Sequence, residues 1–220
     1  KLTVENCSYD GTITICLDCN YGTETVEKDR HFGGLFGAVY TNEGVALTNC
    51  EINGGMSNSA ELEGRALMGG AIGILQTHNA TSGNTSVSFG NCNNSLSIEC
   101  MYTRECTIGG FIGALEMKST HTEIIIQDCT TSGSLTTEEV IEETIGGFVG
   151  VLNGSDYSER CSFVIEHCES NGEIRSYYSQ NPSSSESSSS SGGFVAVVET
   201  SNGLLEFDVI NSTNNGNIEI

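Results

Sequence analysis

The chain has no tryptophan, a single proline and only eight lysine and arginine residues. Because 29 aspartates and glutamates oppose those few cations, the formal net charge is −21. That charge excludes nucleic acids and anionic membranes as natural partners. No apolar run reaches the roughly 18 residues that suggest a membrane-spanning helix, and no apolar stripe has a helical period. We therefore expect an all-β chain without a membrane span.

Arrangements of residues typical of catalysis or metal binding are also missing. β-Helix enzymes that act on polysaccharides need clustered carboxylates in a cleft lined by aromatic rings, and the histidines here have no partner at a suggestive spacing. The sequence contains no His-Glu-x-x-His, no Asp-rich calcium loop, and no second Cys-x-x-Cys to complete a zinc site. We expect no catalytic residues, no metal and no cofactor.

What the chain does contain is a thirteen-residue frame that returns six times. Each frame opens with an apolar residue and has another two positions later, which is typical of a strand. The opening residues are Leu2, Val45, Val87, Ile124, Phe163 and Phe207, and their partners are Val4, Leu47, Phe89, Ile126, Ile165 and Val209.

A polar column follows two positions further on, and a cysteine column comes directly after it. The polar column is Asn6, Asn49, Asn91, Asp128, His167 and Asn211, and the next positions are Cys7, Cys50, Cys92, Cys129, Cys168 and Ser212. Because the polar column continues the two-residue spacing of the apolar residues, we expect its side chains to point inward at a corner. There it would bond to the next coil and to the turning backbone, as a structural ladder without a catalytic role.

A Gly-Gly element precedes five of the frames, beginning at Gly33, Gly69, Gly109, Gly146 and Gly192. The resulting period near forty residues indicates a solenoid, a propeller or an array. A propeller blade needs antiparallel strands joined by hairpins, and no hairpin turn joins the strands consistently. We predict a single-domain, right-handed parallel β-helix over residues 1–220, with about five to six coils and three short strands per coil.

Two of the Gly-Gly elements carry a resemblance to known repeats. The repeated combination of a Gly-Gly-Phe-Val-Gly element, as at 146–150, with a strand ending in Asn-Cys, as at 91–92, and a Gly-x-Ile piece resembles the GLUG-type repeat of secreted and surface proteins. The element at 69–72, Gly-Gly-Ala-Ile, is similar to that of polymorphic outer-membrane proteins. The resemblance covers nearly the whole chain apart from its loops, and implies a β-helix of adhesin-like proteins.

Ten cysteines and six Asn-x-Ser/Thr sequons argue for an oxidising, secretory route. The first frame has no Gly-Gly element before it and the last has none after it, so we expect a processed chain or a segment of a longer one. Column cysteines on neighbouring coils lie within disulfide reach, which allows Cys7 with Cys50 and Cys92 with Cys129. Local bridges Cys16 with Cys19 and Cys100 with Cys106 are also expected. The alternative is that the column cysteines stack as small apolar residues.

The sequons differ in their expected accessibility. Asn79, Asn84 and Asn153 follow the Gly-Gly strands in turns, so we expect N-glycans there, and Asn93 is a further candidate. Asn6 and Asn211 belong to the ladder that we expect to be inward, so a glycan there would conflict with the core. A Ser-rich insertion at 179–191 is expected to be either O-glycosylated or disordered.

The Gly-Gly strand also predicts an association face. If its fourth and sixth positions point inward, its third and seventh positions point outward, and these are apolar too. The face would include Leu35, Phe111, Phe148 and Phe194, covered either by the chain's own loops or by another molecule. The third glycine of the element, such as Gly113 or Gly150, would leave room for the covering loops or molecule to approach closely.

Together these patterns predict an extracellular, glycosylated structural or adhesive solenoid that performs no catalysis. Open coil ends expose strand edges, so we expect head-to-tail or lateral self-association. Two alternatives are a glycan-binding adhesin module, which calls for an outward aromatic column, and a polysaccharide-active enzyme, which calls for carboxylates converging on one face.

Overall fold

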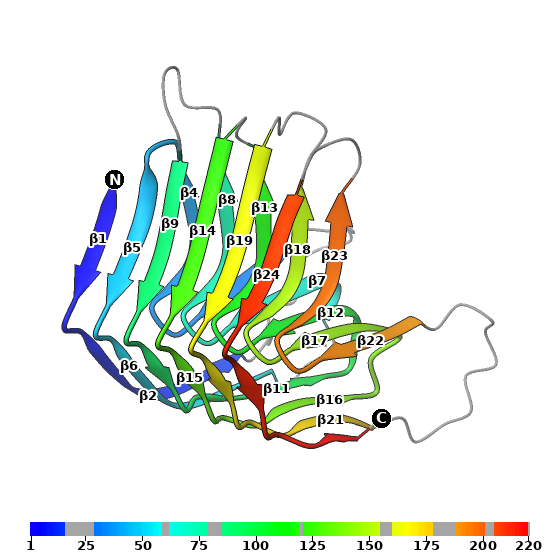
Figure 1. Ribbon diagram of the computed structural model, residues 1–220. Helices are drawn as coiled ribbons and strands as arrows, with labels where there is room; N and C mark the ends of the chain where they lie inside the picture. The colour runs from blue at the N-terminus through cyan, green and yellow to red at the C-terminus, as the bar shows by residue number, and fades with distance from the viewer. Residues whose placement is uncertain are drawn as a thin grey trace.

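A computed structural model describes residues 1–15, 29–58, 62–78, 85–118, 121–154, 160–177, 188–200 and 205–219. These residues form strands and no helix, and the strands stack in parallel as a β-solenoid (Figure 1). The predicted fold class is therefore confirmed. One detail differs, because each coil passes through four sheets, which we call A, B, C and D in chain order, and not three.

Sheet A carries the alternating residues that open each frame. Val45 pairs with Val87 and Leu47 with Phe89, and all four are buried. The frame columns thus become apolar ladders inside the solenoid, as the period-two pattern predicts. The strands of sheet A are β1 (Leu2–Glu5), β5 (Gly44–Thr48), β9 (Thr85–Gly90), β14 (His121–Gln127), β19 (Arg160–Glu166) and β24 (Leu205–Ile210).

Sheet B follows the polar corner and holds the remainder of each frame. Its strand is continuous in the first two coils and divides into two short strands in the later ones. Its members are β2 (Ser8–Ile15), β6 (Glu51–Asn58), β10 (Asn93–Asn94), β11 (Ser97–Met101), β15 (Thr130–Thr131), β16 (Leu135–Glu138), β20 (Glu169–Ser170), β21 (Ile174–Tyr177), β25 (Thr213–Asn214) and β26 (Ile218–Glu219).

Sheets C and D lie on either side of the Gly-Gly turn. Sheet C holds β3 (Arg30–Gly33), β7 (Leu62–Gly69), β12 (Thr103–Gly109), β17 (Glu142–Gly146) and β22 (Ser188–Gly192). Sheet D holds β4 (Phe36–Thr41), β8 (Ile72–Thr77), β13 (Ile112–Met117), β18 (Val149–Gly154) and β23 (Val195–Thr200). The end of the Ser-rich segment, from Ser188, is thus strand and not loop, and residues 178–187 lie outside the described part.

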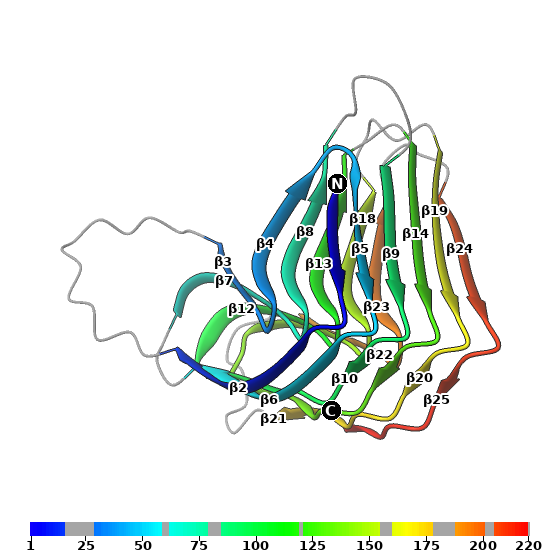
Figure 2. The ribbon, with the colours of Figure 1, turned by 90° about the vertical axis from the view of Figure 1, so that its left-hand side faces the viewer.

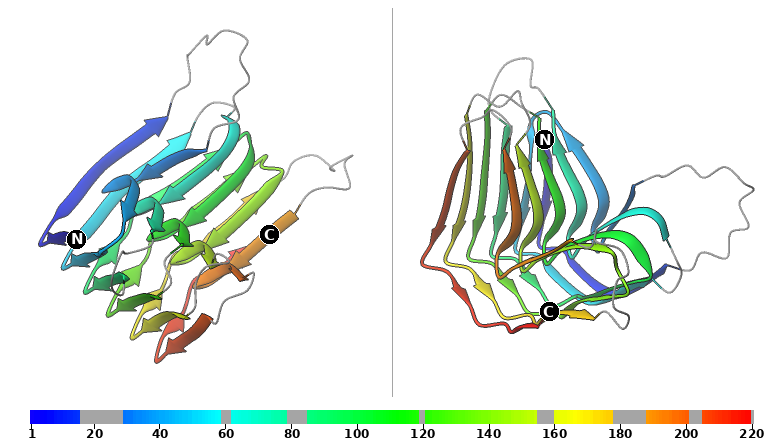
Figure 3. Two further views of the ribbon diagram at one scale, coloured as in Figure 1. Left: turned by 90° about the horizontal axis from the view of Figure 1, so that it is seen from above. Right: turned by 90° about the vertical axis from the view of Figure 1, so that its right-hand side faces the viewer.

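The coil has an L-shaped cross-section, in which sheets A and D face each other and sheets B and C form the foot (Figure 2). Phe89 from sheet A meets Phe111, at the start of sheet D, with ring centroids 5.9 Å apart. Viewed from above, the strands of successive coils lie side by side along the stack (Figure 3). One apolar core runs through the coils.

The Gly-Gly turn lies at the inner angle of the L and packs against sheet B. A Cβ atom on Gly70 would collide with the Asn94 side chain of sheet B, and one on Gly147 would collide with the Ser170 hydroxyl. Asn94 is buried, and its Nδ2 donates a hydrogen bond to the Gly110 carbonyl of the turn. The glycines are therefore required because sheet B and the turn are in contact.

Candidate functional site

The corner between sheets A and B is where the polar column lies, and its backbone is left-handed. The φ angles are 53° at Asn6, Asn49, Asp128 and His167, 51° at Asn91 and 48° at Asn211. Asn, Asp and His are the non-glycine residues enriched in this region, so the backbone accounts for the composition of the column.

The side chains of this column are all exposed, so the predicted inward orientation of Asn6, Asn49, Asn91, Asp128, His167 and Asn211 is wrong. Side chains alternate between the core and the solvent along the preceding strand, and the left-handed residue interrupts this alternation. Extending the two-residue period through the corner therefore placed the polar side chains in the core, whereas they face solvent.

A ladder between coils nevertheless exists on the outside. The Asn49 amide Nδ2 donates to Asn6 Oδ1 at 3.3 Å, and Asn211 Nδ2 lies 3.4 Å from His167 Nε2. The main chain also links the corners, with Asn6 N donating to the Thr48 carbonyl at 3.0 Å. The column thus stabilises the corners of neighbouring coils while its side chains face solvent.

The cysteine column closes this corner from the inside. Each thiol donates to the carbonyl two residues earlier, as Cys129 does to Gln127 at 3.2 Å and Cys168 to Glu166 at 3.2 Å. Ser212, which breaks the cysteine pattern, makes the same bond to Ile210 at 2.9 Å. The shared feature of the column is therefore a hydrogen-bond donor that secures the turn.

The column cysteines are free thiols, buried except at Cys7. The structure therefore has the stacked arrangement and not the bridges expected for Cys7 with Cys50 and Cys92 with Cys129. Neighbouring coils are linked through hydrogen bonds, since the Cys92 amide donates to Cys129 Sγ at 3.4 Å. Hydrogen bonding with the Cys129 side chain is the largest cause that lowers the pKa of Cys92 and of Cys168.

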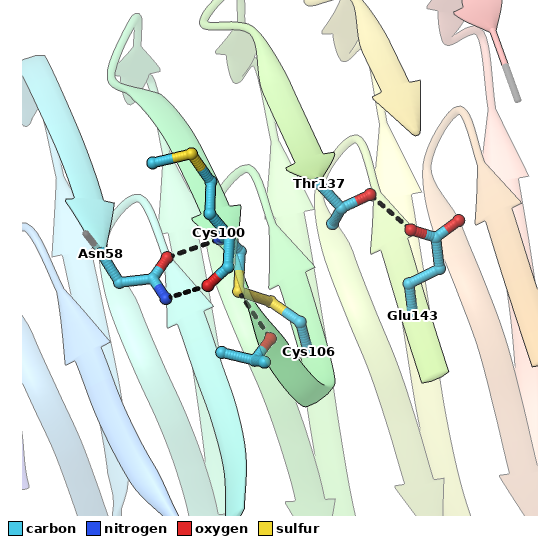
Figure 4. The surroundings of a disulfide bond; sticks show 7 residues. Asn58, Cys100, Cys106, Thr137 and Glu143 are labelled. Carbon is cyan, nitrogen blue, oxygen red and sulfur yellow. Dashed lines mark hydrogen bonds between the residues drawn. A yellow bond between two sulfur atoms is a disulfide. The ribbon is translucent and has the colours of Figure 1, made fainter. Parts of the chain in front are cut away.

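The corner between sheets B and C contains the disulfide Cys100–Cys106, as predicted (Figure 4). It ties the end of β11 to β12. Asn58 of the preceding coil brackets the same corner, donating to the Met101 carbonyl at 2.6 Å and accepting from the Met101 amide at 2.7 Å. The other expected local pair, Cys16 with Cys19, lies outside the described residues.

The next coil closes this corner with a hydrogen bond in place of the disulfide. Thr137 pairs in register with Cys100 and Glu143 with Cys106, and the Thr137 hydroxyl donates to the Glu143 carboxylate (Figure 4). Ser189 of the following coil donates to the other Glu143 oxygen at 2.6 Å. The buried carboxylate thus has a partner on each oxygen, as a buried charge requires.

The predicted association face is not on the surface. Phe111 and Phe148 are fully buried with their rings stacked at 5.3 Å, and Phe194 continues the stack at 5.6 Å. Leu35 and Phe194, in the outer coils, are half-buried and pack against the core. The prediction that Leu35, Phe111, Phe148 and Phe194 point outward is therefore wrong.

The Gly-Gly turn explains this error. The amides of Phe111 and Ile112 both donate to the single carbonyl of Phe148, at 2.9 and 3.0 Å, so the backbone bends there and does not alternate as in a regular strand. The coils stay in one-to-one register on both sides of the bend. Both side chains are consequently buried in the core. Strict alternation would have placed one of them outside.

The third glycine of the element does provide room for a close approach, but to the chain itself. A Cβ atom on Gly113 would lie 2.8 Å from the Met68 carbonyl oxygen, and one on Gly150 would lie 2.7 Å from that of Ile108. Both oxygens belong to the sheet C strand of the preceding coil. The sharp angle between sheets C and D therefore depends on these glycines.

A groove of about 220 Å³ lies in the concave angle where sheets C and D meet. Its lining is mainly polar and acidic, and includes Arg65, Glu105, Glu116, Glu142, Asn153 and Glu199. Lys118 pairs with Glu116 at 2.9 Å, and Arg65 with Asp29 at 2.7 Å. No aromatic side chain is among the described residues that line it, so the outward aromatic column typical of a glycan site is not found here.

The predicted glycosylation sites are placed as follows. Asn93 is exposed on β10, whereas Asn153 is half-buried in the groove with its Nδ2 donating to Glu199 at 3.1 Å. Asn79 and Asn84 lie outside the described residues.

No metal centre or membrane helix was found in the part of the chain that the structure describes. No group of three or more His, Cys, Asp and Glu residues there is arranged to hold a metal ion. None of its segments is a helix able to cross a membrane.

No family model, no curated protein and no solved structure matches this chain. The resemblance to GLUG-type repeats and to outer-membrane repeats therefore stays an expectation, and any function has to be argued from the solenoid itself.

Proposed function

We propose that the chain is an extracellular, glycosylated β-solenoid with a structural or adhesive role, which acts through its shape and its repetition and performs no catalysis. The observation that carries this proposal is the apolar surface of the last coil. Phe207, Val209 and Ile218 belong to core columns, yet they are 39%, 41% and 43% exposed. Unpaired strand edges and exposed core residues together favour the addition of another coil.

The first coil offers the complementary surface. Leu2, Val4 and Ile13 stand in the same columns as Phe207, Val209 and Ile218, and they are only partly buried. The β1 strand of a second copy can therefore pair with β24 and extend every ladder in register. A head-to-tail contact of this kind is heterologous, and it produces a filament when it does not close.

A charge placed on the last coil tests this contact. Val209→Glu would put a carboxylate on the exposed end of the ladder, and we expect it to abolish concentration-dependent association in sedimentation velocity. Ile125→Glu is the control, because Ile125 is half-buried on β14, one of the two central strands of sheet A. Equal association of both variants and the unmodified chain would rule out the end contact.

Net charge gives this association a dependence on salt. Two copies at −21 each repel one another, and the repulsion is screened over about 10 Å at 0.1 M ionic strength. We expect the association to strengthen as sodium chloride rises, which sedimentation equilibrium measures. Weakening by salt would indicate that attractive charges hold the copies together.

A glycan-binding adhesin module is the second candidate, and the groove between sheets C and D favours it. The groove offers carboxylates, an amide and a guanidinium to sugar hydroxyls, for instance from Glu105, Asn153 and Arg65. Calorimetric titration of neutral oligosaccharides against the chain and against Glu142→Ala tests it. Binding that Glu142→Ala removes would favour this candidate.

A further inference from the structure

We propose that Asn6 and Asn211 are N-glycan acceptors, and that with Asn93 they make the corner between sheets A and B a glycan-bearing edge. This inference rests on the proposed extracellular function. It also reverses the expectation from the sequence, which rejected Asn6 and Asn211 because their column was thought to point inward.

Both residues combine a sequon with an outward side chain. The sequons are Asn6-Cys7-Ser8 and Asn211-Ser212-Thr213, and the sequon residues Asn6, Ser8, Asn211 and Thr213 are all exposed. The left-handed turn directs each amide away from the core, and the chain then enters sheet B. An oligosaccharide on either amide therefore meets no apolar ladder.

The hydrogen bonds of the two amides leave the reacting nitrogens accessible. Asn6 accepts a bond at Oδ1 from Asn49, and its Nδ2 makes no hydrogen bond to any described residue. Asn211 Nδ2 has one long contact of 3.4 Å to His167. By comparison, Asn153 Nδ2 donates to Glu199 inside the groove, so a glycan there would have to displace that bond.

The modification itself is a group transfer from an oligosaccharide linked to a lipid diphosphate. A bond forms between Asn Nδ2 and the anomeric carbon of the sugar. The bond between that carbon and the diphosphate oxygen breaks, and one amide proton leaves with the lipid diphosphate. The amide nitrogen keeps one hydrogen, and no oxidant or reductant is needed.

The three sites lie along one line of the solenoid. Asn6 and Asn211 occupy the same corner column at its two ends, about 24 Å apart if coils are spaced by about 4.8 Å. Asn93 lies between them, two residues beyond the corner residue Asn91. Glycans here would exclude this edge from lateral contacts, while the groove between sheets C and D stays clear.

The test is to secrete the chain from eukaryotic cells behind an added leader and to map the glycans. Enzymatic deglycosylation in heavy-oxygen water labels each occupied asparagine, and peptide mass spectrometry locates the labels. We expect labels at Asn6, Asn93 and Asn211 in folded, secreted material. Ser8→Ala and Thr213→Ala should each lose one glycan and stay folded, because both residues are exposed.

A gain-of-site variant makes the test independent of the natural sequons. Asn49 has the same left-handed, exposed corner geometry but no sequon, and Glu51 is exposed. Glu51→Ser supplies the missing hydroxyl, and we expect it to add one glycan at Asn49 without loss of thermal stability.

The outcomes separate this inference from the proposed function. Label at Asn93, with none at Asn6, Asn211 or the Asn49 sequon, would overturn the inference and leave the extracellular proposal intact. Absence of glycan from every site, Asn93 included, would contradict the glycosylated function and the inference with it.

Discussion

At the scale of single residues, the corner between sheets A and B shows how backbone geometry selects side chains. The column accepts Asn, Asp and His, which differ in charge and size but share a tolerance for positive φ. Polarity is a second requirement, because the same side chains face solvent. The column therefore needs no ligand or reaction to explain it.

Substitutions at Asn91 test this explanation, because its φ is 51°. We expect Asn91→Val to lower the free energy of unfolding by about 1–2 kcal/mol, since a left-handed conformation costs a β-branched residue at least that much. Asn91→Gly is the control and should change stability little. Urea unfolding followed by circular dichroism measures both. Equal effects of Val and Gly would contradict the explanation.

The cysteine column makes a second prediction at this scale. If the thiol of Cys168 matters as a donor to the Glu166 carbonyl, Cys168→Ser should be more stable than Cys168→Ala, by about 1 kcal/mol for the retained bond. Ser212 already makes the equivalent bond. The reverse order, with Ala above Ser, would show that the cysteine acts as a small apolar residue. Thermal unfolding of the two variants decides between them.

At the scale of elements, successive coils close the same corner with different kinds of bond. The corner between sheets B and C is closed by Cys100–Cys106 in one coil and by Thr137 with Glu143 in the next. Register, and not residue identity, is what the coils have in common.

Because the registers coincide, the disulfide should be transferable. We expect Thr137→Cys combined with Glu143→Cys to form a second bridge, and to raise the free energy of unfolding by about 2 kcal/mol relative to its reduced form. Thiol counting under denaturing conditions, with and without reductant, detects the bridge. Two additional free thiols in the folded, air-oxidised variant would show that the two corners differ.

The third glycine of the Gly-Gly element makes a prediction about the angle between sheets C and D. Gly150→Val should destabilise the fold by about 1–3 kcal/mol, since its side chain would meet the backbone of the preceding coil. Gly55→Val is the control, because nothing lies within 4 Å of a Cβ atom there. Denaturant titration should separate the two variants. Similar stability of both would mean that the coils can move apart.

At the scale of the whole molecule, the sequence predicted the solenoid but twice assigned side chains to the wrong side. The apolar columns at Val45 and Leu47 were placed correctly because they lie within an uninterrupted strand. The errors at Asn91 and Phe111 both follow a local break, a left-handed residue in one case and the Gly-Gly turn in the other. Each break changes the alternation, and period-two counting cannot detect it.

Other features depended on contacts between coils that no single repeat contains. The collision that keeps Gly70 a glycine comes from Asn94, which belongs to the following coil. The groove between sheets C and D arises from columns of several coils, such as Glu105 beside Glu142. These features require knowledge of how the sheets pack, whereas the hydrogen-bond donor column could have been recognised from the replacement of cysteine by Ser212.

The central claim is that the solenoid assembles end to end, and electron microscopy of folded, glycan-bearing material tests it most directly. The account predicts unbranched filaments at high protein concentration, with the coils spaced by about 4.8 Å along the axis, and their loss in Val209→Glu. Short separate rods at every concentration and salt level would contradict it, and would leave the groove between sheets C and D as the surface to investigate.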